Sequence, residues 1–169
     1  MTDELLEKVR EALGDKVLDS HASVGDATIL VAREQIVEVM QTLRDHTELR
    51  FNFLMDLTAV DYLGREPRFD VVYHLASIEE QPRGTAPCRL FHRLRVKIGV
   101  PEETCEAPSM VELWPAANWM EREVWDLYGI RFQGHPDPRR ILLYEQFEGH
   151  PLRKDYPKER RQPLVGSRN

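Results

Sequence analysis

The chain has 169 residues, of which 41% are hydrophobic and 31% charged, and its formal net charge is −6. This composition is typical of an ordinary soluble globular domain and excludes a disordered chain. No run approaches the ~18 consecutive apolar residues that a membrane-spanning helix needs, and the N-terminal segment lacks the basic and apolar regions of a secretory signal. Only two cysteines occur, without CxxC spacing, which argues against a disulfide framework, an iron–sulfur cluster or a Cys-rich zinc site and fits a reducing cytoplasm.

The charge is unevenly distributed along the chain. Residues 131–169 carry nine Lys and Arg against five Asp and Glu, a balance of +4, which leaves −10 for the first 130 residues. A basic tail on an acidic body is typical of a segment that contacts a partner. We therefore divide the chain into a body, residues 1–130, and a partner-binding tail, residues 131–169.

The first part of the body predicts two helices and a hairpin. Apolar residues recur at helical spacing over 3–13 and again over 33–45. Between these helices, segments 16–24 and 27–32 flank a Gly25-Asp26 turn and predict a β-hairpin.

Three further strands are predicted, over 51–62, 68–78 and 88–98. Gly64 and Pro67 interrupt the connection between the first two and exclude a helix there. The third strand alternates in polarity, which is typical of a half-buried antiparallel strand. Its inward face carries Cys88, Leu90, His92, Leu94, Val96 and Ile98, and its outward face carries Arg89, Phe91, Arg93, Arg95 and Lys97.

A last helix is predicted over 118–128. Asn118 stands at the N-cap, Glu121 takes the third position of a capping box, and Gly129 ends the helix. Arg122 and Asp126 are four residues apart, so we expect them to form an ion pair on the helix surface.

These elements predict an α+β fold of two layers, with an antiparallel or mixed sheet, helices mainly on one face, and an extended C-terminal tail. The tail has five prolines and a single apolar run, residues 141–144. Ordering a backbone costs ~1–2 kcal/mol per residue. We therefore expect the tail to be poorly ordered in the isolated chain and ordered in a complex.

The tail contains Gly-His-Pro twice, at 134–136 and 149–151. His135 and His150 have no Cys nearby and no carboxylate at ligand spacing, which argues against a zinc site. The following prolines exclude a helical HExxH arrangement. We expect Gly and Pro to set two sharp turns, with each imidazole bonded to backbone.

Two sets of charged residues are candidates for chemistry. Glu121, Glu123 and Asp126 could perform acid–base catalysis, but Arg122 among them favours ion pairing instead. The basic face of strand 88–98, together with basic residues of the tail, could bind single-stranded nucleic acid, although an acidic body repels phosphate. The sequence has no GxSxG, Walker or GxGxxG motif, so it favours a binding and scaffolding protein over an enzyme.

The run NWMEREVWDLYGIRFQGHPDPRRILL, followed by GHPLRKDYP, resembles the signature of the 30 kDa subunit of respiratory complex I, the C-subunit family of NADH:quinone oxidoreductases. The resemblance spans residues 118–157 and rests on Glu121-Arg122-Glu123, Asp126 to Gly129, Gly134 to Asp137, Arg139 to Leu142 and Gly149 to Pro157.

This resemblance implies a peripheral-arm subunit beside the D subunit of the complex, near the quinone-reducing end, on the cytoplasmic side of a bacterial inner membrane. In the family, this subunit has no catalytic residue and no cofactor or metal of its own, so we expect flavin and iron–sulfur clusters in partner subunits. Its implied work is to hold its neighbours in register while electrons pass from NADH to quinone. The two Gly-His-Pro turns then correspond to corners of a tail laid along the D subunit.

The expected interface residues are those of the signature: Glu121, Arg122, Glu123, Asp126, His135, Arg139, Arg140, His150, Arg153, Lys154, Asp155 and Tyr156. Related subunits occur in membrane-bound hydrogenases, formate hydrogenlyase and ferredoxin- or F420-linked complexes, and the motif does not separate these. A free-standing nucleic-acid or anion-binding module remains a hypothesis of another class, and a small hydrolase has the least support.

Overall fold

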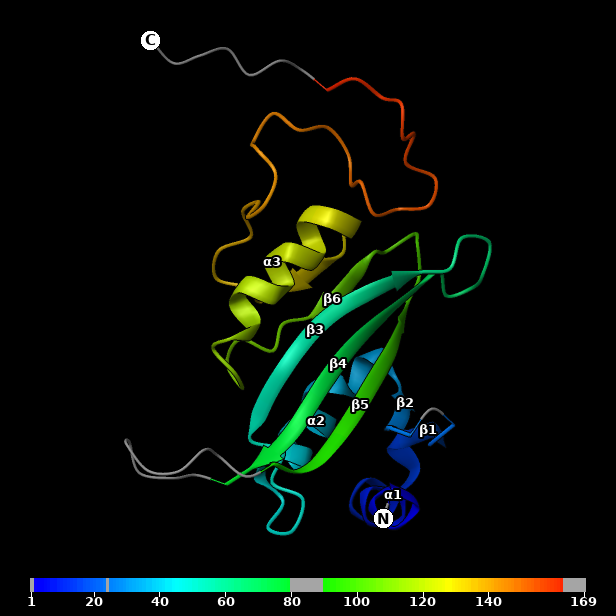
Figure 1. Cartoon of the computed structure of the whole chain (residues 1–169), viewed down its shortest axis with the longest axis vertical. Coiled ribbons are helices and arrows are strands. Elements are labelled where there is room, and N and C mark those ends of the chain that lie inside the picture. Colours follow the sequence, from blue (N-terminus) through cyan, green and yellow to red (C-terminus); the bar gives the residue numbers. More distant parts are fainter. Residues whose placement is uncertain (1, 24, 80–89, 163–169) are drawn as a thin grey trace.

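A five-stranded mixed sheet forms the centre of the computed structural model, which describes residues 2–23, 25–79 and 90–162 (Figure 1). The strand order is β1-β2-β5-β4-β3. Only the β2–β5 pair is parallel, and the other neighbours are antiparallel. The strands are β1 Val17–His21, β2 Ala27–Val31, β3 Phe53–Asp61, β4 Phe69–Ile78 and β5 Leu90–Val100. The predicted mixed sheet, the hairpin and the strand segments are confirmed.

Helices flank this sheet, and a second sheet of two parallel strands lies beside it. In Figure 1, α2 lies behind the large sheet, α1 lies at the lower end of the molecule below β1, and α3 lies beside β3. No helix among the described residues is long and apolar enough to cross a bilayer. The helices are α1 Thr2–Leu13, η1 Gly14–Lys16, η2 Arg33–Gln35, α2 Ile36–Asp45 and α3 Ala117–Tyr128, and the small sheet pairs β6 Glu106–Pro108 with β7 Arg131–Gln133.

One face of the large sheet builds the hydrophobic core. Leu57, Tyr73 and Val96 are neighbours across β3, β4 and β5, and all are buried in one cluster with apolar residues of α1, α2 and α3. On the opposite face, the neighbours His74 and Arg95 are half-buried. The alternation along each strand therefore turns one face toward the helices, as the two-layer prediction requires.

The predicted register of β5 is correct over most of its length. Leu94 and Val96 are buried, whereas Arg93 is exposed. Leu90 was expected to point inward, but its side chain is 48% exposed. The reason is that β2 pairs with β5 only from Leu94 onward, so Leu90 extends past the covered part of the sheet. The predicted positions 88 and 89 lie outside the described residues.

The start of α3 differs from the predicted capping box. Its N-cap is Ala116, and no side chain caps the helix there. Glu121 is instead turned into the interior, where its Oε1 accepts a hydrogen bond from the amide of Met110 at 2.6 Å. The predicted end is confirmed, because Gly129 takes the left-handed conformation with φ of 77°.

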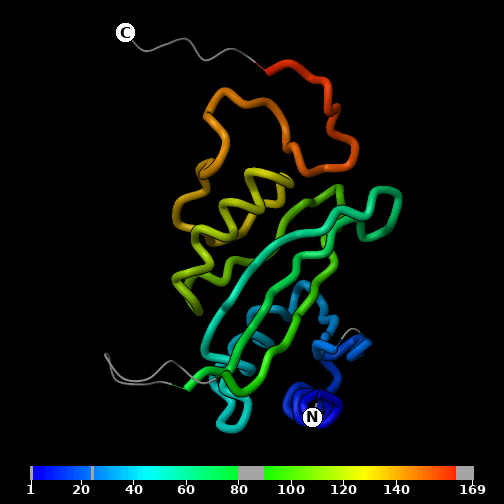
Figure 2. The backbone as a smooth tube through the Cα atoms, in the orientation of Figure 1, coloured from blue at the N-terminus to red at the C-terminus, as the bar shows by residue number. Residues whose placement is uncertain are grey.

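The tail leaves α3 through β7 and then crosses back over the helix (Figure 2). The described residues 134–162 contain no helix and no strand, as expected from the prolines. β7, however, pairs with β6 of the body, so regular structure continues three residues past the predicted boundary at residue 130.

We predict that Gly129→Ala destabilises the chain more than Gly134→Ala. Both glycines have positive φ, so each alanine costs about 1–2 kcal/mol of backbone strain. A Cβ at Gly129 would also lie 2.6 Å from Cδ2 of His150, whereas a Cβ at Gly134 has no atom within 4 Å. This overpacking adds about 1–3 kcal/mol. Urea unfolding measures both free energies, and equal losses would contradict the packing of His150 on Gly129.

Candidate functional site

The carboxylate of Asp126 is the point at which the tail is fastened to α3. This side chain is fully buried. Its Oδ1 accepts a hydrogen bond from Nη1 of Arg140 at 2.5 Å, and its Oδ2 accepts three from consecutive tail amides, those of Ile141, Leu142 and Leu143, at 3.1, 2.9 and 2.9 Å. Burial alone would raise the pKa of Asp126, but the hydrogen bonds from Leu143, Arg140, Leu142 and Ile141 together outweigh it and hold the pKa below its ordinary value.

Arg140 closes the segment that follows it into an arch. Its Nη2 donates to the carbonyls of Phe147 and Gly149 at 2.9 and 3.2 Å, while Nη1 holds Asp126. The guanidinium also lies over the rings of Trp125 and Phe147, 5.5 and 5.8 Å from their centroids. We call residues 140–149 the arch. Leu142 in the arch is 61% exposed.

After the arch, the tail caps the C-terminal end of α3. Nδ1 of His150 lies 2.9 Å from the carbonyl of Asp126, and the amide of Leu152 donates to the carbonyl of Leu127 at 3.0 Å. Nε of Arg153 donates to the carbonyl of Tyr128 at 2.5 Å. These carbonyls belong to the last turn of the helix, which has no partners of its own for them. The positive charge of Arg153 also suits the negative end of the helix dipole.

Both Gly-His-Pro turns follow the backbone-bonded arrangement that the sequence predicts. His135 accepts the amide of Asp137 on Nδ1 and places Nε2 3.0 Å from the carbonyl of Asn118. His150 bonds the helix end, as above. Among the described residues, no group of three His, Cys, Asp or Glu side chains is arranged to hold a metal ion. That the chain binds no metal stays a prediction.

A second fastening point joins the tail to the large sheet. The guanidinium of Arg68, which is only 2% exposed, donates to both oxygens of Asp61 at 2.8 Å and to both oxygens of Asp155 at 2.7 and 3.2 Å. It also bonds Glu102 at 2.5 Å, and the amide of Lys154 donates to Asp61 at 2.8 Å. The hydrogen bonds from Arg68 lower the pKa values of Asp61 and Asp155.

These contacts bear on two expectations. Hydrogen bonds join the tail to the body at positions from Arg139 to Asp155, and whether the tail is poorly ordered in the isolated chain stays a prediction. The surface pair of Arg122 with Asp126 is wrong, because Asp126 is turned inward. Arg122 donates instead to the carbonyls of Arg139 and Arg140, each at 2.9 Å.

By burial, the expected interface residues fall into three groups. Glu121 and Asp126 are fully buried, and their side chains serve intrachain contacts. The side chains of Glu123, Arg139, Lys154 and Asp155 remain exposed, and Arg122, His135, Arg140, His150, Arg153 and Tyr156 are half-buried. The role of these residues at an interface stays a prediction. Arg68 was missed because it stands at the start of a strand, where a basic residue is ordinary.

Glu121 is a buried carboxyl, and one of its two oxygens makes no hydrogen bond to the described residues. Its Oε2 has no partner among the described residues, and neither has the hydroxyl of Tyr73, which is also buried. Burial raises the pKa of Glu121 to about 7, although the hydrogen bond from Met110 opposes this shift. Glu121 and Asp126 are five residues apart on one helix, and their pKa values shift in opposite directions because Asp126 has a cation and three amides and Glu121 does not.

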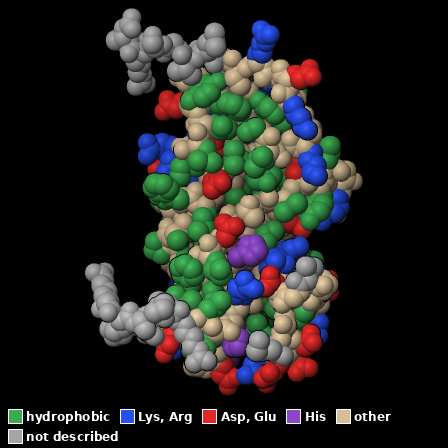
Figure 3. All heavy atoms as spheres, viewed as in Figure 1, with side chains coloured by type: hydrophobic (Ala, Val, Ile, Leu, Met, Phe, Trp, Pro, Cys, Tyr) green, Lys and Arg blue, Asp and Glu red, His purple; other side chains and the backbone are tan. Residues whose placement is uncertain are grey.

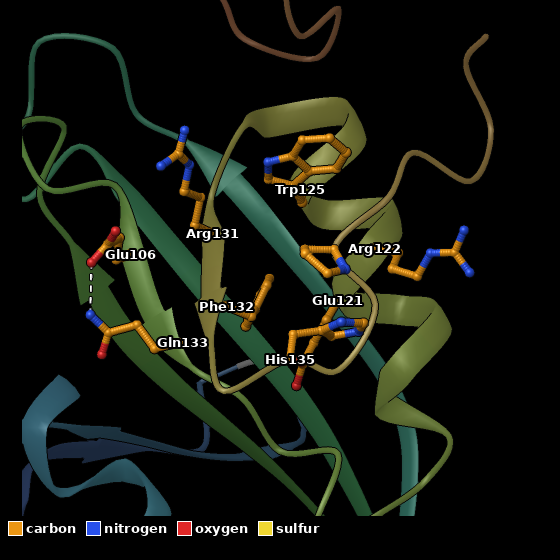
Figure 4. A pocket seen from close by; sticks show the side chains of 9 residues that line it. Glu106, Glu121, Arg122, Trp125, Arg131, Phe132, Gln133 and His135 are labelled. Carbon is orange, nitrogen blue, oxygen red and sulfur yellow. Dashed lines mark hydrogen bonds between the residues drawn. The ribbon is translucent and has the colours of Figure 1, made fainter. Parts of the chain in front are cut away.

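A pocket of ≈ 400 Å³ lies between α3 and β7, and we call it the α3–β7 pocket (Figure 4). It brings together three expected interface residues, Glu121, Arg122 and His135, with residues that the sequence did not single out. Its lining comprises Glu106, Glu121, Arg122, Trp125, Arg131, Phe132, Gln133, His135 and Pro138.

Comparison with known proteins gives consistent similarities. The family described as "Respiratory-chain NADH dehydrogenase, 30 Kd subunit" matches residues 29–162. The C subunit of NADH-quinone oxidoreductase from Roseiflexus sp. strain RS-1 is 50% identical over 153 residues, which cover 90% of this chain and 82% of that one. The same-named protein of Geobacter metallireducens is 48% identical over 157 residues, with 92% and 90% covered.

Two solved structures share the fold. A trypsin-resistant fragment of Nqo5 superposes with a TM-score of 0.63 at 35% identity, covering 81% of this chain and 99% of the fragment. A chain of the membrane-bound sulfane sulfur reductase, an archaeal respiratory membrane complex, has a TM-score of 0.70 at 20% identity, with 93% and 86% covered. At this lower identity, the second likeness shows the fold alone.

We predict that Asp126→Asn lowers the free energy of unfolding by about 3 kcal/mol, because removing one partner of a buried pair leaves Arg140 without its counterion. The contribution of ionised Asp126 to the free energy of unfolding should be fully present above the ordinary carboxyl pKa, about 3.9. It should be lost as pH falls through the lower pKa of the folded state. Urea unfolding across this pH range measures it. Glu123→Gln, at an exposed position of the same helix, is the control, and equal stability of the two variants would contradict the fastening role.

Glu121→Gln should stabilise the folded chain above pH 7, whereas Asp126→Asn destabilises it. The folded state holds the Glu121 proton up to a pKa of about 7, above the ordinary value of 4.5, so wild-type stability should fall as pH rises through this window. Above pH 7 the glutamine variant should be more stable, by up to about 3 kcal/mol at 1.36 kcal/mol per pKa unit. Thermal unfolding from pH 5 to 8 checks this, and parallel profiles for the two proteins would show that Glu121 ionises normally.

Proposed function

Because the chain belongs to the respiratory-chain NADH dehydrogenase 30 kDa subunit family, we propose that it is a scaffold subunit of the peripheral arm, without chemistry of its own. Family membership makes it a subunit of an NADH-quinone oxidoreductase complex, and its partners are other subunits of that complex. The hydrogenase-type assignment and the free-standing nucleic-acid module are not favoured, because the similar relatives are named as the C subunit of NADH-quinone oxidoreductase.

The observation that carries the scaffold role is how the signature residues are used. Asp126, Arg140, His150 and Arg153 all bond to the chain's own backbone or side chains, and so they fix the shape of the tail. None of these four side chains is left free in a cleft where it could act on a substrate. Residues that build a surface in this way suit a protein that positions its neighbours.

The surface that this shape presents is a suitable docking area. The exposed side chains of Leu142 and Leu152 belong to the tail, and that of Trp119 belongs to α3. In Figure 3, hydrophobic side chains gather over the upper half of the molecule, where Figure 1 shows α3 and the tail. Arg139 and Lys154 add exposed cations beside them. Apolar groups rimmed by charges are typical of protein–protein interfaces.

We propose the D subunit of the complex as the neighbour on this surface, near the quinone-reducing end and on the cytoplasmic side of the membrane. The flavin and the iron–sulfur clusters belong, in this proposal, to partner subunits. Cys88 and Cys105 support this, since two separated cysteines cannot supply the four thiolates that a cluster of the Cys₄ type requires.

Leu142→Asp should reduce the amount of assembled complex, because it places a charge in the apolar part of the interface. Leu18→Asp is the matched control, since Leu18 is also 61% exposed but lies on β1. Complex purified from membranes is quantified, and NADH:quinone reductase activity is divided by that amount. For Leu142→Asp, and not for Leu18→Asp, we expect less assembled complex, with normal activity per complex. Normal assembly with activity lost per complex would show that the tail acts in the reaction, against the scaffold role.

A further inference from the structure

The α3–β7 pocket has aromatic and apolar walls. Trp125 projects from α3, Phe132 points from β7 toward the helix, and Pro138 follows in the tail (Figure 4). Trp125 is half-buried, so its ring is only partly covered by the protein itself. Such walls favour a planar, apolar group, because aromatic rings gain from stacking in addition to the area that they bury.

Most polar groups around the pocket are already engaged, and the exceptions are Arg131 and the buried Oε2 of Glu121. Glu106 accepts a hydrogen bond from Gln133 at 2.7 Å, His135 bonds through both ring nitrogens, and Arg122 bonds two tail carbonyls. The exposed guanidinium of Arg131 makes no ion pair or side-chain hydrogen bond within the described part of the chain. The pocket therefore combines an apolar interior with one cation that the described residues leave unpaired.

The surface beside the pocket is apolar as well. Trp119 precedes Arg122 by one turn of α3, so the two side chains lie on the same side of the helix. Trp119 is 69% exposed, the highest value among the large hydrophobic residues that the structure describes. An exposed tryptophan next to a pocket and an arginine has the composition of an interface hot spot.

We propose that the α3–β7 pocket receives an aromatic side chain from another protein of the complex, and that a carboxylate next to this side chain pairs with Arg131. This inference rests on the proposed function, since it requires a partner chain, and it adds the chemistry of the contact. The aromatic ring inserts between Trp125 and Pro138 over Phe132. The neighbouring Asp or Glu of the partner segment supplies the charge that Arg131 lacks.

Peptide binding to the full-length chain tests the pocket. The probe is a capped tripeptide with phenylalanine between two glutamates, and the controls have alanine at the centre or lysines at the flanks. NMR of the tryptophan indole N–H groups should show saturable shifts at Trp125 and none at the buried Trp114. Arg131→Ala should weaken binding of the probe about tenfold, equivalent to the loss of one charge-assisted contact. Arg10→Ala, on the exposed side of α1, should leave it unchanged.

Several results would overturn the proposal. They are equal binding of the phenylalanine and alanine peptides, equal effects of Arg131→Ala and Arg10→Ala, and shifts confined to residues away from Trp125. Benzoate binding as tightly as the tripeptide would identify a small-molecule site instead and would also overturn it.

The assembled complex provides the second test. A photo-crosslinking residue in place of Gln133, at the pocket rim, should form an adduct with a partner segment in which an aromatic residue stands beside Asp or Glu. An adduct with a segment that lacks this pair contradicts the inference while leaving the scaffold function intact. Failure of the wild-type chain to co-purify with other subunits would instead contradict the proposed function.

Discussion

The buried carboxylate of Asp126 is the constraint on which the course of the tail depends. An ionised carboxylate is costly to bury unless its oxygens are fully bonded. Here Arg140 and three successive amides of the arch provide those bonds. The charge therefore requires one particular backbone path over residues 140–143. That path brings Arg140 to the carbonyls that close the arch, and it brings His150 and Arg153 to the end of α3.

The cluster of Arg68 fastens the other end of the same tail to the large sheet. Between the two points the chain forms no helix or strand, but its polar atoms bond to residues in or beside the strands of the body. Bonds of this kind replace a hydrophobic core as the source of order, since the tail has few apolar side chains to bury. In this arrangement Leu142 and Arg139 of the tail and Trp119 of α3 are exposed. A preformed surface loses less entropy on docking than a disordered one, which suits a protein whose work is to position others.

Much of the fold follows from local patterns in the sequence. Alternation in β5 and helical spacing in α1 and α2 identify those elements because each buries one face. Gly129 was predictable as a helix end, and the two histidines of the tail as backbone-bonded, because glycine and proline act locally. The roles of Glu121, Asp126 and Arg68 were not predictable. A carboxylate on a helix can face solvent or the interior, and only tertiary contacts with Met110 or the tail decide which. The α3–β7 pocket was missed for the same reason, since its walls come from separate elements.

Hydrogen exchange at the amides of Ile141, Leu142 and Leu143 in the isolated chain tests the central claim most directly. These three amides lie in a segment without regular structure, and each donates to the buried Oδ2 of Asp126. If Asp126 holds the tail in place, all three should be strongly protected and should lose protection together in Asp126→Asn. Exchange at the rate of an unstructured peptide in the wild-type chain would contradict the account, because the tail would then take its order from a partner alone.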